Sequence, residues 1–115
     1  MDFEFTRGDT KIFKFKLKDK NGEKLKLSST DKIYLTVKRS AKSTEKAFQK
    51  TIGNGIELKN DGYYYVTINS NDTADLDYAT YGYDIEIKTA SGIVKTLLIG
   101  SITLTEEYTF KGDEI

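Results

Sequence analysis

The sequence predicts an all-β fold, an antiparallel β-sandwich of about seven to nine strands. Three observations predict it. Apolar and polar side chains alternate along most of the chain, turn sequences recur about every 8–12 residues, and β-branched and aromatic residues are plentiful where helix signals are nearly absent. With 115 residues the chain has the size of one domain, so residues 1–115 are expected to form a single unit around one core.

The first half of the chain contains two strong strand patterns. The apolar residues of one alternate with lysines: Phe13, Phe15 and Leu17 against Lys14, Lys16 and Lys18. Asn21-Gly22 then favours a turn into Leu25 and Leu27, which predicts a hairpin. The other pattern runs through Ile33, Leu35 and Val37, with Tyr34 on the opposite face. Residues 39–46 are polar and aperiodic, so we expect the longest loop there.

The second half predicts four more strands and one helical turn. A weak strand over residues 48–52 and a small one over 56–58 precede residues 63–68, where Tyr64, Val66 and Ile68 should point inward. A capping Ser or Asn predicts a helical turn near residues 71–76, with Leu76 closing one end of the core. Strands over residues 81–88 and 93–104 follow, and Gly100 predicts a bulge or bend where the last strand meets a second partner.

The segment Asp77-Tyr78-Ala79-Thr80-Tyr81-Gly82-Tyr83 narrows the fold class. It matches an immunoglobulin pattern in which an aromatic residue precedes a buried core position by two residues, and here that core position is Tyr83. The Tyr81 ring would cover one end of the sandwich, and its hydroxyl would satisfy a backbone group where the chain crosses between layers. The sequence therefore predicts an immunoglobulin-like sandwich whose centre is filled by large side chains: Phe15, Leu35, Tyr83 and Ile85.

Composition excludes most familiar catalytic chemistries. The chain has no cysteine and no histidine, which removes disulfides, thiolate metal sites and the imidazole general base. Chemistry built only from carboxylates remains open, but no pattern indicates it. We therefore expect a protein that is not an enzyme and that needs no cofactor and no metal.

Charge is balanced overall but unevenly distributed. Residues 1–50 hold 14 Lys and Arg against 7 Asp and Glu, whereas residues 51–115 hold 4 against 11. If the two halves formed different sheets, the particle would be dipolar and suited to head-to-tail packing; interleaved strands would mix the charges instead. No apolar run of signal-peptide or membrane-spanning length is present, so we expect no membrane partner.

Several segments together resemble phage β-sandwich modules. They are Phe5-Thr6-Arg7-Gly8-Asp9-Thr10, Asp72-Thr73, Ala79 to Ile85, and Val94 to Gly100. The chain is similar over nearly its full length to the N-terminal domain of phage baseplate upper proteins and to small tail- and neck-associated proteins. The resemblance implies a non-catalytic structural module of the virion, made in the bacterial cytoplasm. Its implied partners are other phage structural proteins and further copies of itself.

Two groups of side chains are candidates for partner contact. Tyr34, Tyr63 and Tyr65 fall on predicted outer faces, where they would either form a patch for a protein or sugar partner or pack in a covered sheet. Lys14, Lys16 and Lys18, with Lys24 and Lys26, would form a basic face. Neutral overall charge and the lack of an arginine cluster favour a solvated or partner-docking face over nucleic-acid binding. The alternative function is a carbohydrate- or receptor-binding module that uses the exposed tyrosines.

Three short motifs have both a functional and a structural interpretation. Asp72, Asp75 and Asp77 would hold calcium only in a site built from loops, because the EF-hand spacing is absent. Arg7-Gly8-Asp9 matches an adhesion tripeptide, but Gly8 also suits a tight turn between strands. Asn71-Asp72-Thr73 matches a glycosylation acceptor, and we expect it to cap the helical turn instead.

Overall fold

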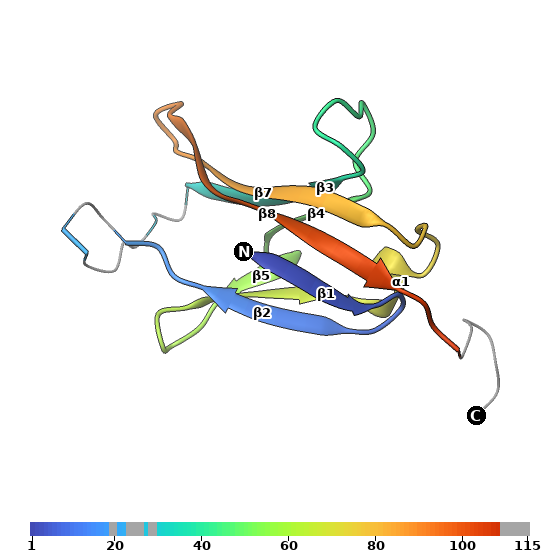
Figure 1. The fold of residues 1–115 in the computed structure, drawn as a ribbon. Coiled ribbons are helices and arrows are strands. Elements are labelled where there is room, and N and C mark those ends of the chain that lie inside the picture. The colour runs from blue at the N-terminus through green and yellow to red at the C-terminus, as the bar shows by residue number, and fades with distance from the viewer. Residues whose placement is uncertain (19–20, 23–26, 28–29, 109–115) are drawn as a thin grey trace.

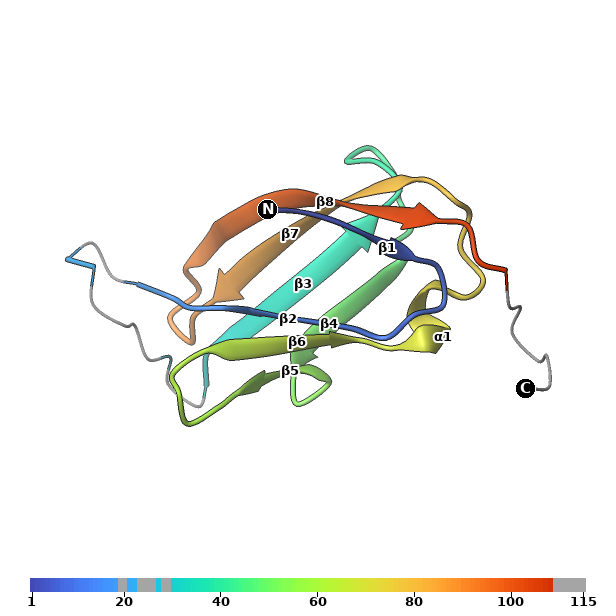
Figure 2. The same ribbon diagram turned by 60° about the horizontal axis from the view of Figure 1, so that its bottom comes forward.

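The chain folds into one eight-stranded sheet that closes on itself almost as a barrel (Figures 1 and 2). The computed structural model describes residues 1–18, 21–22, 27 and 30–108. Its elements are β1 Asp2–Thr6, β2 Lys11–Phe15, β3 Lys32–Lys38, β4 Phe48–Ile52, β5 Gly55–Leu58, β6 Tyr64–Ile68, α1 Ser70–Thr73, β7 Thr80–Lys88 and β8 Val94–Thr105. The predicted all-β class is confirmed. In the described part of the chain, the one short helix is far too small to cross a membrane.

The strand order is β1-β8-β7-β3-β4-β5-β6-β2. Strands β8, β7, β3 and β4 form one layer, and β5, β6 and β2 form the layer facing it (Figure 1). The prediction of a purely antiparallel sheet is wrong, because β1 pairs with β8 and β4 with β5 in parallel. The β4–β5 pairing arises where the chain steps sideways through Gly53 and Asn54 without reversing, and this step joins the two layers into one sheet.

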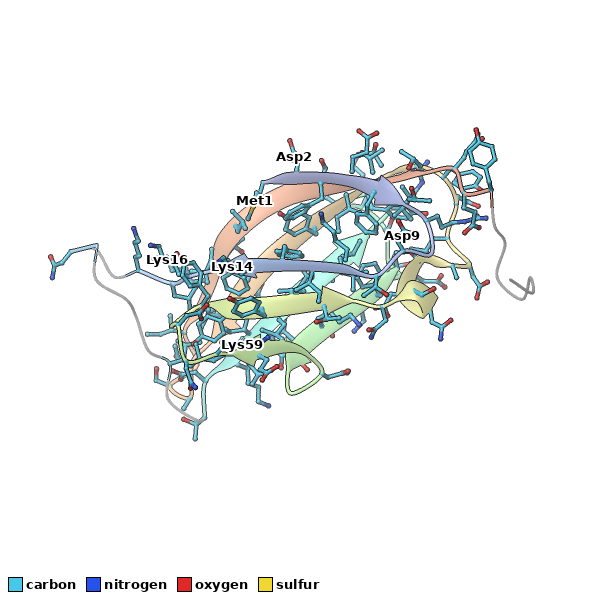
Figure 3. All side chains as sticks on the ribbon, turned by 90° about the horizontal axis from the view of Figure 1, so that it is seen from below. Met1, Asp2, Asp9, Lys14, Lys16 and Lys59 are labelled. Carbon is cyan, nitrogen blue, oxygen red and sulfur yellow. The ribbon has the colours of Figure 1, made fainter. Side chains whose placement is uncertain are left out.

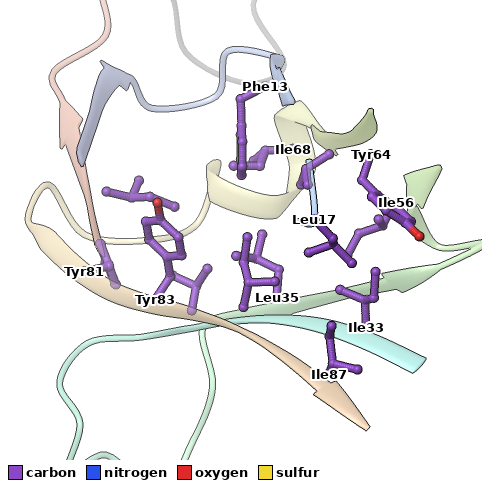
Figure 4. Packing of buried hydrophobic residues seen from close by; sticks show 14 of the residues in the cluster. Phe13, Leu17, Ile33, Leu35, Ile56, Tyr64, Ile68, Tyr81, Tyr83 and Ile87 are labelled. Atoms are coloured by element: carbon purple, nitrogen blue, oxygen red, sulfur yellow. The ribbon is translucent and has the colours of Figure 1, made fainter. Parts of the chain in front are cut away.

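The core lies between the two layers and follows the predicted alternation. Leu35, Tyr83 and Ile85 are buried as predicted, as are Tyr64, Val66 and Ile68. Figure 4 shows Ile33, Leu35 and Ile87 pointing toward Phe13, Ile68 and Tyr64 of the opposite layer. Phe15 is only half-buried, because it lies near one end of the core and stacks on the Tyr64 ring with 5.4 Å between the centroids.

Aromatic side chains bridge the seam of the near-barrel. Strands β1 and β2 stand at the two ends of the strand order, and no ladder joins them in the described chain. The rings of Phe3 and Phe13 lie 4.5 Å apart between centroids, so one ring from each strand meets its counterpart across the gap. Side-chain packing therefore closes this part of the structure where backbone hydrogen bonds do not.

The last strand has two partners, as predicted. β8 pairs with β7 over most of its length and with β1 from Ser101 to Thr105. The predicted bulge lies at Leu97 and not at Gly100, since Ile85 faces Leu98 and Glu86 faces Thr96. The pairing of β1 with β8 begins at Ser101, directly after Gly100. The edge of β8 before Gly100 carries the bulge and Lys95, two features that disfavour pairing with a further strand.

The remaining predictions for individual elements have mixed outcomes. The helical turn begins at Ser70, one residue before the predicted range, and ends at Thr73; Leu76 is half-buried and packs against the core. Gly22 and Gly62 have positive φ, as turn glycines should. The predicted hairpin strand at Leu25, with Lys24 and Lys26, lies outside the described residues, as does the chain end from residue 109.

The predicted hydrogen bond of Tyr81 is confirmed. Tyr81 is 4% exposed, and its hydroxyl donates to the carbonyl of Asp77 over 2.9 Å. The bond ties the start of β7 to the preceding turn, where the chain passes from one layer to the other.

Tyr81→Phe is expected to lower the free energy of unfolding by about 1 kcal/mol, the usual net contribution of one such bond. Urea denaturation would measure the change. Tyr108→Phe makes the same chemical change on a ring that is 97% exposed, so it should have little effect on stability. Equal losses for the two variants would contradict a stabilising role for the Tyr81 bond.

Candidate functional site

Two of the predicted tyrosines and two of the predicted lysines meet on the outer face of β2 and β6. Phe13 and Phe15 of β2 point into the core, so Lys14 and Lys16 point outward. Tyr64 and Val66 are buried in β6, so Tyr63 and Tyr65 lie on the outer side. The register places Lys14 opposite Tyr65.

Lys59, from the turn between β5 and β6, completes this surface. Figure 3 shows Lys14, Lys16 and Lys59 gathered on this side of the molecule. We call these five residues the lysine–tyrosine face: Lys14, Lys16, Lys59, Tyr63 and Tyr65. Lys18 is exposed beyond the end of β2, and it contacts neither ring in the described structure.

The ammonium groups lie over the two rings. The Lys14 Nζ is 4.5 Å from the centroid of Tyr63 and 5.9 Å from that of Tyr65. The Lys16 Nζ is 5.5 Å from Tyr63, and the Lys59 Nζ is 4.4 Å from Tyr65. Each ring therefore faces two cations within the range of cation–π attraction, about 6 Å from the ring centroid.

Asp61 fixes the position of both tyrosines. Its carboxylate accepts the backbone N–H of Tyr63 over 3.0 Å and the hydroxyl of Tyr65 over 2.5 Å. The hydrogen bond from the Tyr65 hydroxyl to Asp61 raises the pKa of Tyr65, and partial desolvation acts in the same direction. The hydroxyl is therefore held as a donor with a fixed partner, and the two rings present a pre-organised surface.

Tyr34 does not belong to this surface. It lies on the outer face of β3, in the opposite layer, where the Lys88 Nζ is 5.6 Å from its ring centroid. The three tyrosines therefore do not share one patch, since only Tyr63 and Tyr65 lie together. Alternation along a strand indicates which side chains point outward, but it does not indicate which layer the strand will join.

Asp72 takes part in an ion pair that sequence analysis missed. The Nζ of Lys50 in β4 lies 2.6 Å from an Asp72 carboxylate oxygen, and the lysine side chain is only 6% exposed. The same oxygen accepts the backbone N–H of Asn69. Among the described residues no three acidic side chains converge, so Asp72, Asp75 and Asp77 do not form a calcium cage.

The alternation of side chains along β4 could have indicated that Lys50 is buried. Phe48, Lys50 and Ile52 share one face of β4, and Lys50 sits opposite Leu35, which is fully buried. Gly55 leaves room for the lysine stem, because a Cβ at that position would overlap the Lys50 side chain. A lysine in register with apolar residues indicates an inward position when an acidic partner can reach it.

The Arg7-Gly8-Asp9 segment is a structural turn. The Arg7 guanidinium donates to Glu107 over 2.7 Å and to the carbonyl of Leu76 over 2.9 Å. Gly8 has a φ of +84° and donates its N–H to the buried Thr73 hydroxyl. Since Arg7 is engaged within the chain, the tripeptide is not presented for adhesion. The N-cap of α1 is Asn69, not the predicted Ser or Asn of residues 70–71, and Asp72 completes the cap by accepting the Asn69 N–H.

The two oppositely charged halves of the sequence do not form separate layers. Strands β1, β2 and β3 from the first half pair with β8, β6 and β7 from the second. Positive and negative segments are thus interleaved, which excludes the dipolar arrangement.

No protein-family model matches the chain, and no curated protein is similar enough to it to count as a relative.

Proposed function

We propose that this chain is a non-catalytic assembly module of a phage tail, baseplate or neck, which acts through protein–protein contacts. The observation that carries the proposal is the lysine–tyrosine face, where two tyrosines and three lysines from β2, β6 and the β5–β6 turn form one surface. Tyrosine is enriched in protein interfaces because it offers a large, rigid contact area and a polar tip. The three ammonium groups favour a partner with an acidic surface.

We propose that the fold is immunoglobulin-like. The order β2, β6, β5 follows that of strands B, E and D, and β3, β7, β8 follows that of C, F and G. The Tyr81 hydrogen bond to Asp77 supports this assignment, because it has the geometry of the tyrosine corner of such domains. The resemblance to phage modules supports a place in the virion, with other structural proteins and further copies of this chain as partners.

Sugar binding at the lysine–tyrosine face is less favoured. A sugar stacks its apolar C–H groups on an aromatic ring, and each ring here already has an ammonium group within 4.5 Å of its centroid. A partner's carboxylates, in contrast, could pair with those ammonium groups without displacing them. The geometry therefore favours a protein partner over a carbohydrate at this face.

The experiment is co-expression of the tagged chain with the products of the genes that flank its own. We expect one of them to co-purify and Lys14→Glu with Lys16→Glu to weaken the complex by about tenfold or more, because the acidic partner then meets like charge. Lys18→Glu is the matched control, since Lys18 is exposed nearby but lies outside the face. A chain that stays monomeric at high concentration and binds no flanking product would overturn the proposal.

A further inference from the structure

A groove of about 590 Å³ lies on the outer face of the other layer, above β3, β7 and β8. The loop between β3 and β4 and the turn between β7 and β8 both rise on this side of the sheet (Figure 1). Gly82 contributes to the hollow, because it is exposed and no heavy atom lies within 4 Å of the place its Cβ would occupy. The volume is within the range of small-ligand sites in proteins, about 300–1,000 Å³.

The floor of the groove combines an aromatic ring with hydrogen-bonding groups. Tyr34 lies opposite Glu86, and Thr36 lies between Asp84 and Gln49 in the adjacent row. The Gln49 amide donates to the Thr36 hydroxyl over 2.9 Å, which fixes its orientation. Beside this row Ile99 is 74% exposed, so an apolar side chain borders the polar ones.

The charges that line the groove are balanced and unpaired. Asp84, Glu86 and Lys88 come from β7, and Lys38 comes from β3 beside it. None of these four side chains makes an ion pair with any residue that the structure describes. Two carboxylates and two ammonium groups with unused hydrogen-bonding capacity therefore face one hollow.

We propose that this groove binds a neutral oligosaccharide. A sugar ring would stack on Tyr34, which has one ammonium group at 5.6 Å, close to the outer limit of about 6 Å for such contacts. The hydroxyls of the ligand would donate to Asp84 and Glu86, while the lysines and Gln49 supply further polar contacts.

Other ligand classes fit the groove less well. An acidic ligand would be repelled by the two carboxylates, and a basic ligand would be repelled by the two ammonium groups. The charges of the groove therefore give neither ligand a net electrostatic attraction. An extended peptide that adds to a sheet needs a free strand edge. Both edges of β3 and of β7 are already paired within the sheet, and the edge of β8 before Gly100 carries a bulge and Lys95, which disfavour the addition of a peptide strand.

The test is an array of neutral and acidic oligosaccharides probed with the intact chain. We expect binding to neutral members that 0.5 M salt leaves unchanged, a concentration at which the Debye length is only about 4 Å. Tyr34→Ala should weaken the binding by about tenfold or more, and Gly82→Leu should do so independently by filling the hollow. Tyr63→Ala on the lysine–tyrosine face is the matched control and should bind as the parent chain does.

Three results would overturn the inference: no binding to any neutral member, binding to acidic members alone, or binding that is lost with Tyr63→Ala and kept with Tyr34→Ala. Urea denaturation checks that each variant folds. If the Tyr34 variant does not fold, Gly82→Leu still tests whether the groove is the binding site. The inference does not rest on the proposed assembly role, since the two sites lie on opposite layers and have separate tests.

Discussion

Asp72→Asn is expected to lower the free energy of unfolding by about 3 kcal/mol, because it leaves the buried ammonium group of Lys50 without a counter-charge. Removing one partner of a buried ion pair usually costs about 3–5 kcal/mol. The lower end applies here, since the Asp72 side chain is 21% exposed and water reaches part of it. Urea denaturation monitored by tyrosine fluorescence would measure the loss.

Two further variants separate the ion pair from other roles of Asp72. The double variant Lys50→Met with Asp72→Asn should recover most of the lost stability, because a buried pair replaced by groups of similar size is often close to neutral. Asp77→Asn removes a carboxylate from an exposed residue nearby and should change stability by less than about 0.5 kcal/mol. A double variant as unstable as Asp72→Asn alone would contradict the explanation.

Gly100→Ala is expected to lower the free energy of unfolding by about 2–3 kcal/mol and to loosen β1. A Cβ at Gly100 would overlap the carbonyl of Met1 and lie 2.8 Å from the ring of Tyr83. The Tyr83 hydroxyl donates to that same carbonyl over 2.7 Å, so neither neighbour can move without breaking the bond. Hydrogen exchange should show the amides of residues 2–6 losing protection before the rest of the sheet.

Gly82→Ala is the control for this prediction. Gly82 in β7 pairs with Ser101, the residue that follows Gly100 in β8. A Cβ added at Gly82 would point into open space. The substitution should therefore leave stability within about 0.5 kcal/mol of the parent chain. If both glycine variants lost the same stability, the cause would be the conformational freedom of glycine and not the close approach of Met1 to Gly100.

Features encoded by local pattern could be predicted from the sequence. The alternation around Leu35, Val66 and Ile85 predicted their burial correctly, because a strand with one covered face must place every second side chain inward. The hydrogen bond of Tyr81 was also predictable, since its partner is the carbonyl of Asp77, only four residues earlier.

Features set by contacts between distant segments could not be predicted. The parallel pairs of β1 with β8 and of β4 with β5 leave no mark on the alternation of either strand. Lys59 was missed because it lies in a turn, and only the folded chain brings it over Tyr65. The groove at Tyr34 was missed for the same reason, since its polar groups come from β3, β4 and β7, and β7 lies far from the other two strands in the sequence.

The pairing of Asp2 with Ser101 has a consequence for how the protein is made. The first strand leaves the ribosome well before its partner in the sheet, because Ser101 lies 99 residues after Asp2 in the chain. Closing so long a loop is entropically costly and slow, so β1 should dock after the other strands have formed. Until then Phe3 is absent from the seam, and a nascent chain exposes the Phe13 side of its core to other nascent chains and to chaperones.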